Sequence, residues 1–154
     1  MASSLFAATF KALMTDDGVT VDFDNDTFNC ALVKLAGWTP QFDTDATYAD
    51  IDSELPATGN YALGGETLTG VTLTQTSDGS AEITFDAADV SWTSSTLTDV
   101  RAGVIYSKTV NDDSTSNKSL IAYIDFEGDF STTSGTFEIQ WNASGIFTLD
   151  LKPA

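Results

Sequence analysis

The residues best suited to chemistry form an acidic cluster, in which Asp22, Asp24 and Asp26 alternate with other residues. Several carboxylate oxygens close together are what hard cations such as Ca²⁺ prefer. The spacing does not fit an EF-hand calcium loop, because Thr27 stands at the glycine position and Val33 at the bidentate glutamate position. In a strand, carboxylates two residues apart share a face without converging on one ion. We therefore expect a solvated acidic strand face and no metal, with a nonstandard Ca²⁺ or Mg²⁺ site as the alternative.

The sequence offers few side chains for catalysis. Its 154 residues include no histidine and one cysteine, Cys30, which excludes a Ser-His-Asp triad, a Cys-His pair, a histidine-ligated zinc and an internal disulfide. With no basic neighbour to activate it, Cys30 is expected to be a small buried hydrophobe. A glycosidase needs two carboxylates across a cleft, and 23 Asp and Glu residues make chance pairs unavoidable. Asp125 comes closest to a candidate, although ending a buried strand at the surface is its expected role.

Aromatic side chains suggest a different kind of site, since exposed Trp and Tyr stack on sugars in β-sandwich binding modules. Trp92 and Trp141 are in phase with apolar neighbours and are expected in the core. Trp38 and Tyr61 lie near predicted loops and are the better candidates for contact with a glycan. The basic residues are scattered, and Arg101, at the start of a predicted central strand, is expected to pair with an acid.

The charge limits the partners. Six Lys and Arg against 23 Asp and Glu give a formal charge of −17, with a pI near 4.1. Nucleic acid and anionic membranes are therefore not expected as partners, because binding to phosphates needs basic side chains. The sequence has neither the basic and apolar regions of a signal peptide nor a run of 18 apolar residues. A hydrophobic fraction of 42%, with 10 Phe, 4 Tyr and 3 Trp, favours a folded domain with a real core.

The elements that must position these residues are mostly strands. Apolar residues alternate with polar ones, or run continuously, over 19–28, 30–35, 81–85, 90–92, 100–106, 120–126, 137–141 and 146–151. The nearly continuous runs 100–106 and 120–126 predict central strands covered on both sides. The last two segments predict a hairpin. Together the pattern predicts a mainly β fold, an antiparallel β-sandwich of about 7–8 strands, with a barrel as the second choice.

Two short helices are predicted before the strands. The first is about ten residues long, capped by Ser3 or Ser4, and a second is expected within 43–55, capped by Asp43, Thr44 or Asp45. The apolar face of the first helix consists of Leu5, Phe6, Phe10, Leu13 and Met14. This face must dock on the domain's own core or on a partner, because so short a helix is not stable alone. The predicted organisation is a helical arm at 1–17 and a β-sandwich domain at 18–154.

Most of the chain resembles a family of small virion proteins of tailed bacteriophages. The resemblance covers about residues 27–151 and lies in the order and spacing of segments 28–33, 85–92, 102–108, 119–126, 137–141 and 145–147. It implies a β-sandwich fold and a place among the structural components of a phage. It carries no catalytic motif, and it leaves open whether the protein belongs to the head or the tail.

The acidity favours the head's outer surface over an interior packed with DNA. We therefore expect a decoration (cement) protein, not an enzyme, that needs no cofactor, binds the outer surface of the major capsid protein lattice and self-associates as a dimer or trimer. The residues that contact the capsid are expected to lie on the first helix. Deletion of residues 1–14 should therefore weaken assembly more than it lowers the stability of the domain. The alternatives are a tail, fibre or adaptor component that touches host glycan through Trp38 and Tyr61, and a carboxylate glycosidase.

Overall fold

The computed structural model describes residues 2–15, 19–108 and 118–152, and its fold is mainly β. The elements are, in order, β1 (Ser4–Leu5), α1 (Ala7–Met14), β2 (Phe28–Val33), the 3₁₀ turn η1 (Tyr48–Asp50), β3 (Glu66–Thr67), β4 (Thr72–Gln75), β5 (Glu82–Asp86), β6 (Val90–Ser95), β7 (Val100–Ser107), β8 (Leu120–Phe130), β9 (Gly135–Ile139) and β10 (Phe147–Asp150). The predicted antiparallel sandwich is confirmed. Its described part has ten strands, because β1 and β3 are two-residue strands too short to leave an alternating pattern.

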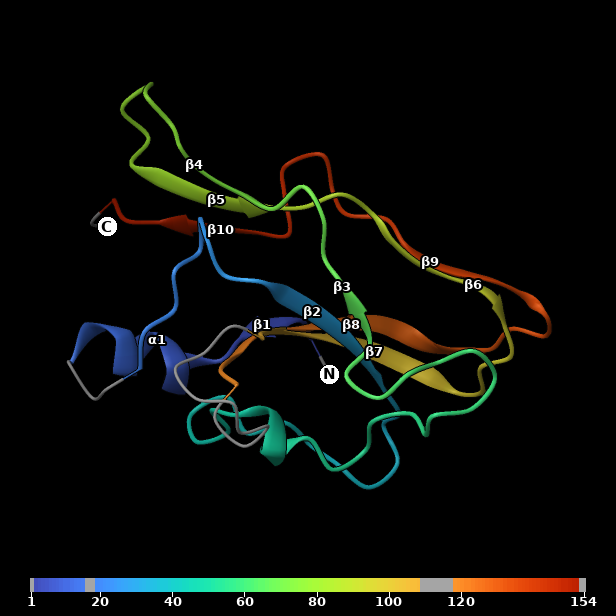
Figure 1. Cartoon of the computed structure of the whole chain (residues 1–154). Helices are drawn as coiled ribbons and strands as arrows, with labels where there is room; N and C mark the ends of the chain where they lie inside the picture. Colours follow the sequence, from blue (N-terminus) through green and yellow to red (C-terminus); the bar gives the residue numbers. More distant parts are fainter. Residues whose placement is uncertain (1, 16–18, 109–117, 153–154) are drawn as a thin grey trace.

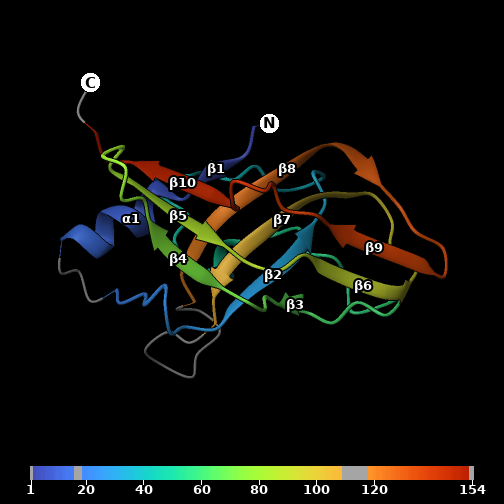
Figure 2. The same ribbon diagram turned by 90° about the horizontal axis from the view of Figure 1, so that it is seen from above.

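The strands form two layers (Figure 1). One layer is a five-stranded sheet in the order β1-β8-β7-β2-β3. The other contains a three-stranded sheet, β10-β5-β4, and a two-stranded sheet, β6-β9. Because β5 leads into β6 and β9 leads into β10, the second layer is a long antiparallel ribbon with a break in the middle (Figure 2). Every strand pair in the described chain is antiparallel.

The five-stranded sheet is apolar on both faces. All six residues of β2 are buried, and so are all residues of β7 except Arg101. Since successive side chains of a strand point to opposite faces, Phe28 and Leu32 of β2 belong to one hydrophobic cluster, and Ala31 and Val33 to another. The two predicted central runs are thus correctly placed in the two longest strands, and each face of this sheet needs a cover.

The ribbon covers one face. Its inward side chains, which include Phe85, Trp92 and Phe137, pack with the sheet into the larger cluster. Phe28 from the sheet meets Phe85 from the ribbon with ring centroids 5.1 Å apart in a T-shaped contact. Trp141, expected in the core, is half-buried against this cluster, where its indole N–H donates to the carbonyl of Ala88 at 3.0 Å. That bond ties the two sides of the ribbon together at its break.

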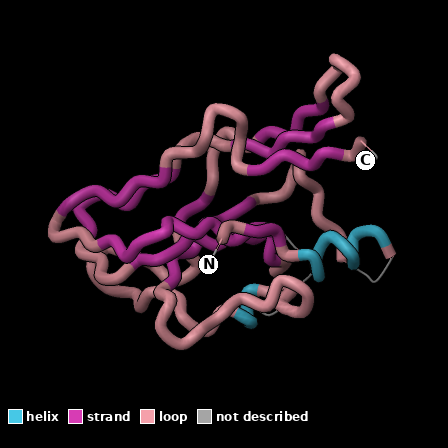
Figure 3. Tube along the Cα trace, turned by 180° about the vertical axis from the view of Figure 1, so that it is seen from behind, coloured by secondary structure: helices cyan, strands magenta, loops and turns pink. Residues whose placement is uncertain are grey.

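A layer built mostly of loops covers the other face (Figure 3). It consists of the chain between β2 and β3, with Trp38, Phe42, Tyr48 and Ile51 turned to the sheet. It is joined to the start of β8, where the Tyr48 N–H donates to the Lys118 carbonyl at 2.7 Å. The buried face that the loops cover explains why this long connection is ordered despite having only one turn of helix.

Three local predictions before β3 are corrected. The strand expected over 19–28 begins only at Phe28, because the Asp22 carboxylate accepts the N–H groups of Asp24 (3.0 Å) and Asn25 (3.2 Å) and folds the segment into a turn. The helix expected within 43–55 is the single turn η1, which follows Thr47 rather than residues 43–45. The first helix starts at Ala7, with Phe6 as its N-cap residue and no side-chain cap, because Ser4 and Leu5 pair with β8 instead.

The predicted C-terminal hairpin is wrong as well. β9 pairs with β6, and β10 pairs with β5, so the two strands lie in different sheets. The turn at 142–145 is real, with Gly145 donating to the carbonyl of Asn142 at 2.8 Å. It shifts the chain along the ribbon rather than reversing it beside β9.

Arg101 makes the ion pair that the sequence predicts. Its Nε lies 2.9 Å from Oδ1 of Asp125, whose side chain is almost fully buried. Burial raises the pKa of this carboxyl, but hydrogen bonds from the Glu127 N–H and from Arg101 outweigh it and hold the pKa below its usual value. Asp125 therefore does not end β8 at the surface. It lies within the strand, opposite Ala102 of β7. The register of the two strands shifts at a bulge between this pair and the next pair, Val100 with Phe130.

Cys30 gives the fold a pH dependence that can be measured. Burial raises the pKa of this thiol to about 12, whereas an unfolded chain releases the proton near pH 8.5. At a pH between these two pKa values, the thiol loses its proton when the chain unfolds. The free energy of unfolding therefore falls as pH rises, by up to about 1.4 kcal/mol per pH unit. Urea unfolding from pH 8 to 11 should show a flatter decline for Cys30→Ala than for the wild type. Equal slopes would contradict the burial of an uncharged thiol.

Candidate functional site

The N-terminal segment, which the sequence singles out as the partner-binding element, is built into the sandwich. β1 pairs with β8, with Leu5 opposite Ala122, and the Phe6 N–H donates to the Ile121 carbonyl at 3.0 Å. Phe6 has no exposed surface and meets Phe42 of the loop layer with ring centroids 5.3 Å apart. Leu5 and Phe6 are thus occupied by the domain's own core.

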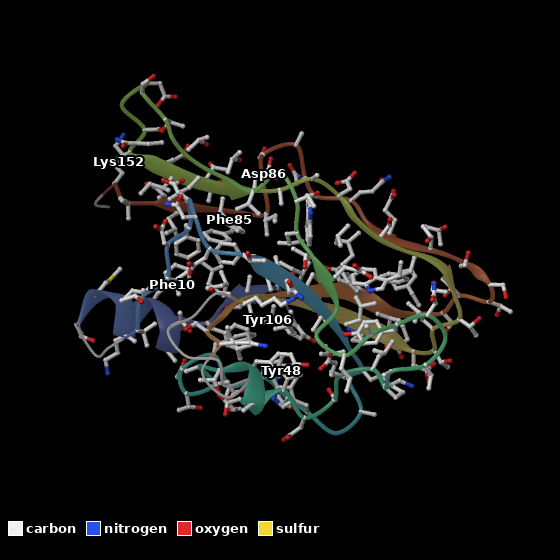
Figure 4. The ribbon with its side chains drawn as sticks, in the orientation of Figure 1. Phe10, Tyr48, Phe85, Asp86, Tyr106 and Lys152 are labelled. Atoms are coloured by element: carbon white, nitrogen blue, oxygen red, sulfur yellow. The ribbon has the colours of Figure 1, made fainter. Side chains whose placement is uncertain are left out.

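Helix α1 continues this docking. Phe10 points from the helix toward the ribbon (Figure 4), where its ring lies 6.1 Å from those of Phe23 and Phe147. Thr9 is buried, and its hydroxyl donates to the Ala46 carbonyl at 3.4 Å. Over its described residues the expected arm at 1–17 therefore packs on the expected domain at 18–154, and the two form one body.

Two members of the predicted apolar face remain for a partner. Met14 is 81% exposed, and Leu13 is half-buried at the end of α1. A groove of about 200 Å³ runs between the edges of the two layers. Leu5, Ile124 and Phe147 are among its lining residues, and the Phe147 ring contacts Phe10 of α1. We call Leu13, Met14 and this groove the α1 surface. It is an apolar surface on a strongly acidic molecule.

Neither aromatic residue predicted to contact a glycan is free to stack on a sugar. Trp38 is 8% exposed and packs edge-on against Tyr123, with ring centroids 6.2 Å apart. Tyr61 is 4% exposed, and its hydroxyl accepts the Leu32 N–H at 3.0 Å and donates to Glu54 at 2.7 Å. Both lie in loops, as expected, but their rings face inward. Trp38 packs in the cluster that the loop layer covers, and Tyr61 packs in the larger cluster beneath the ribbon.

The carboxylates of the acidic cluster stabilise their own turn through hydrogen bonds. Besides the two N–H groups that bond to Asp22, the Asn25 amide donates to this carboxylate at 2.9 Å, and these bonds lower the Asp22 pKa. Asp26 accepts the Ser107 hydroxyl at 3.0 Å and so ties the turn to the end of β7. Within the described residues no group of three or more His, Cys, Asp or Glu side chains is arranged to hold a metal ion.

Sequence reasoning missed a polar cluster around Glu54. Its half-buried carboxylate accepts hydrogen bonds from the hydroxyls of Tyr48 and Tyr61 and from the Gly64 N–H, the last at 2.6 Å. Burial and the neighbouring carboxylate raise the pKa of both phenols, so they remain uncharged donors. The sequence marked Tyr61 only as a candidate for contact with a glycan, and no period or motif links it to Glu54. These hydrogen bonds fix the loop layer to the edge of β2.

Comparison of the chain with protein-family models, with curated protein sequences and with solved structures found no match in any of the three. Among the described residues, no helix is long and apolar enough to cross a membrane. The function is therefore argued from the residues and surfaces themselves.

The docking of the N-terminal segment predicts unequal costs for two substitutions on the same apolar face. Phe6→Ala should lower the free energy of unfolding by about 3–5 kcal/mol, because it opens a cavity between the loop layer and the sheet. Met14→Ala should change it by less than about 0.5 kcal/mol, because the side chain is exposed. Urea unfolding of the two variants checks this. A small effect of Phe6→Ala would show that the segment is an arm detached from the core.

Proposed function

We propose that this protein is a structural component of a tailed-phage virion that decorates the outer surface of the head. It binds the lattice of the major capsid protein and braces it by contact, without catalysis and without a cofactor. The observation that carries the proposal is the resemblance of six segments to the small virion proteins of tailed phages. The β-sandwich that this resemblance implies is the fold of the chain. Four of the six segments include most of β2, β7, β8 and β9, and a fifth includes the first half of β6.

The α1 surface is the proposed contact with the capsid. Burying an exposed side chain such as Met14 contributes about 1.5–3 kcal/mol, which is too little for a stable complex on its own. Self-association as a dimer or trimer lets several such contacts act together, and linked weak contacts give high avidity. The rigid sandwich behind the helix keeps the contacts in a fixed arrangement, which limits the entropy lost on binding.

The charge supports the outer surface as the location. At −17 the protein is repelled by packaged DNA, and the same charge favours solubility on an outer surface. Neither nucleic acid nor a membrane surface is proposed as a partner. The complementary capsid surface should be less acidic than the protein and should present an apolar patch of similar size.

Substitution of Met14 tests the proposed contact. Heads that lack the protein are incubated with wild type, Met14→Asp or Leu35→Asp, and bound protein is measured after sedimentation. Leu35 is a suitable control because it is also an exposed apolar residue but lies outside the α1 surface. We expect Met14→Asp to weaken binding at least about tenfold, because a carboxylate replaces the apolar contact, and Leu35→Asp to bind like the wild type.

Head stability provides the second measurement. Heads with bound wild-type protein should withstand heating or low ionic strength better than bare heads, and heads treated with Met14→Asp should behave like bare ones. Equal stability of bare and decorated heads, together with no added density on the lattice, would overturn the proposal. Labelling confined to the tail would instead favour the tail or adaptor role.

A further inference from the structure

A pocket of about 470 Å³ lies between the chain before β3, the end of β7 and the chain just before β8. Its volume falls in the range of pockets that hold small molecules. Its walls come from β2, η1, β3 and β7, so residues far apart in the sequence meet there. No part of the proposed capsid contact lines it.

One wall of the pocket is fixed before any ligand arrives. The Gly64 N–H donates a hydrogen bond to the Glu54 carboxylate. The Gly64 carbonyl accepts hydrogen bonds from the Asn29 amide (3.0 Å) and the Tyr106 hydroxyl (2.8 Å). The next residue, Gly65, has a φ of +68°, and a Cβ there would overlap the carbonyl oxygen of Cys30. A wall held in this way loses little conformational entropy when a ligand binds.

The charge of the pocket is opposite to that of the protein. Two of the six basic residues, Lys108 and Lys118, line it, together with one acid, Glu66. Among the described residues neither ammonium makes an ion pair, whereas Lys34 and Arg101 are each paired with an aspartate. The Lys118 ammonium lies 5.7 Å from the centre of the Tyr48 ring. Two ammonium groups that make no ion pair within the described part of the chain favour an anionic ligand at this pocket.

Besides the polar Asn29 and Thr67, the lining includes aromatic and aliphatic side chains. Tyr48 packs on Tyr106 with ring centroids 4.8 Å apart, and the two lie together under the sheet (Figure 4). The Tyr48 hydroxyl donates to Glu54, so Tyr48 can contact a ligand only through its ring. Leu63, at 65% exposure, and Ala62 add aliphatic surface. A ligand that fills the pocket therefore needs an apolar body beside its negative charge.

We propose that this pocket binds an organic carboxylate, in which a carboxylate group contacts Lys108 and Lys118 and an adjoining apolar group contacts Tyr48 and Leu63. A free small acid and the C-terminal residue of a peptide share this chemistry. The site is independent of the proposed attachment to a capsid.

Binding of N-acetyl-phenylalanine to the full chain, followed by NMR titration, tests the site. We expect saturable shifts confined to residues of the pocket, and no saturable binding of N-acetyl-phenylalaninamide, acetate or inorganic phosphate, which lack either the charge or the apolar body. Lys108→Gln combined with Lys118→Gln should weaken binding at least tenfold. The matched control, Lys11→Gln combined with Lys152→Gln, removes the same charge outside the pocket and should leave binding unchanged.

A second variant guards against a structural artefact. Leu63→Ser removes an exposed apolar side chain, so it should weaken binding several-fold while the urea midpoint stays at the wild-type value. Equal binding of the acid and its amide, no saturable binding at millimolar concentration, or equal loss in both lysine pairs would each overturn the proposal. A tetrapeptide ending in phenylalanine that binds more tightly than the free acid assigns the ligand to a chain terminus, and equal affinity assigns it to a free acid.

Discussion

The fold depends on one constraint, which is that the five-stranded sheet is apolar on both faces. In β2 and β7 the side chains of both pleat directions are buried, so neither face can meet water. The ribbon of β4, β5, β6, β9 and β10 covers one face and excludes water from it. The loop layer, together with the N-terminal segment, covers the other. The burial of Phe6, the ordered loops and the buried Tyr106 and Tyr123 follow from the need for this second cover.

The sequence predicted which residues face inward better than it predicted which strands pair. The runs that became β7 and β8 were correctly identified because burial on both sides leaves a local pattern. The sequence also predicted that Arg101 pairs with an acid, but it did not show that the acid is Asp125. The pairing of β10 with β5 was missed, since alternation reports the face of a strand and not its neighbour. The turn at Asp22 was missed because its carboxylate competes with strand pairing, while Phe23 still packs against Phe28 as the alternation requires.

The candidate site was predicted only in part, for a related reason. A helical wheel placed Phe6, Phe10 and Met14 on one face, but in the structure Phe6 precedes α1, Phe10 packs against the larger cluster and Met14 is exposed. A helical wheel does not distinguish the residues that meet their own core from those left exposed. Trp38 and Tyr61 were taken as exposed because loops usually lie at the surface. Here the loop is itself a layer. The Glu54 cluster and the lysine-lined pocket join residues from distant segments and left no local pattern to read.

The pairing of Leu5 with Ala122 and the packing of Phe10 on Phe147 set an order of events during synthesis. Leu5 and Phe10 leave the ribosome well before their partners, which are made more than a hundred residues later. Until then a strip of apolar side chains has nothing to cover it, and such strips promote aggregation in incomplete chains. At the same time, contacts that span most of the chain slow folding, since long loops must close before they form. In the cell, yield should therefore depend on how quickly the second half of the chain is made and on chaperones that shield its beginning.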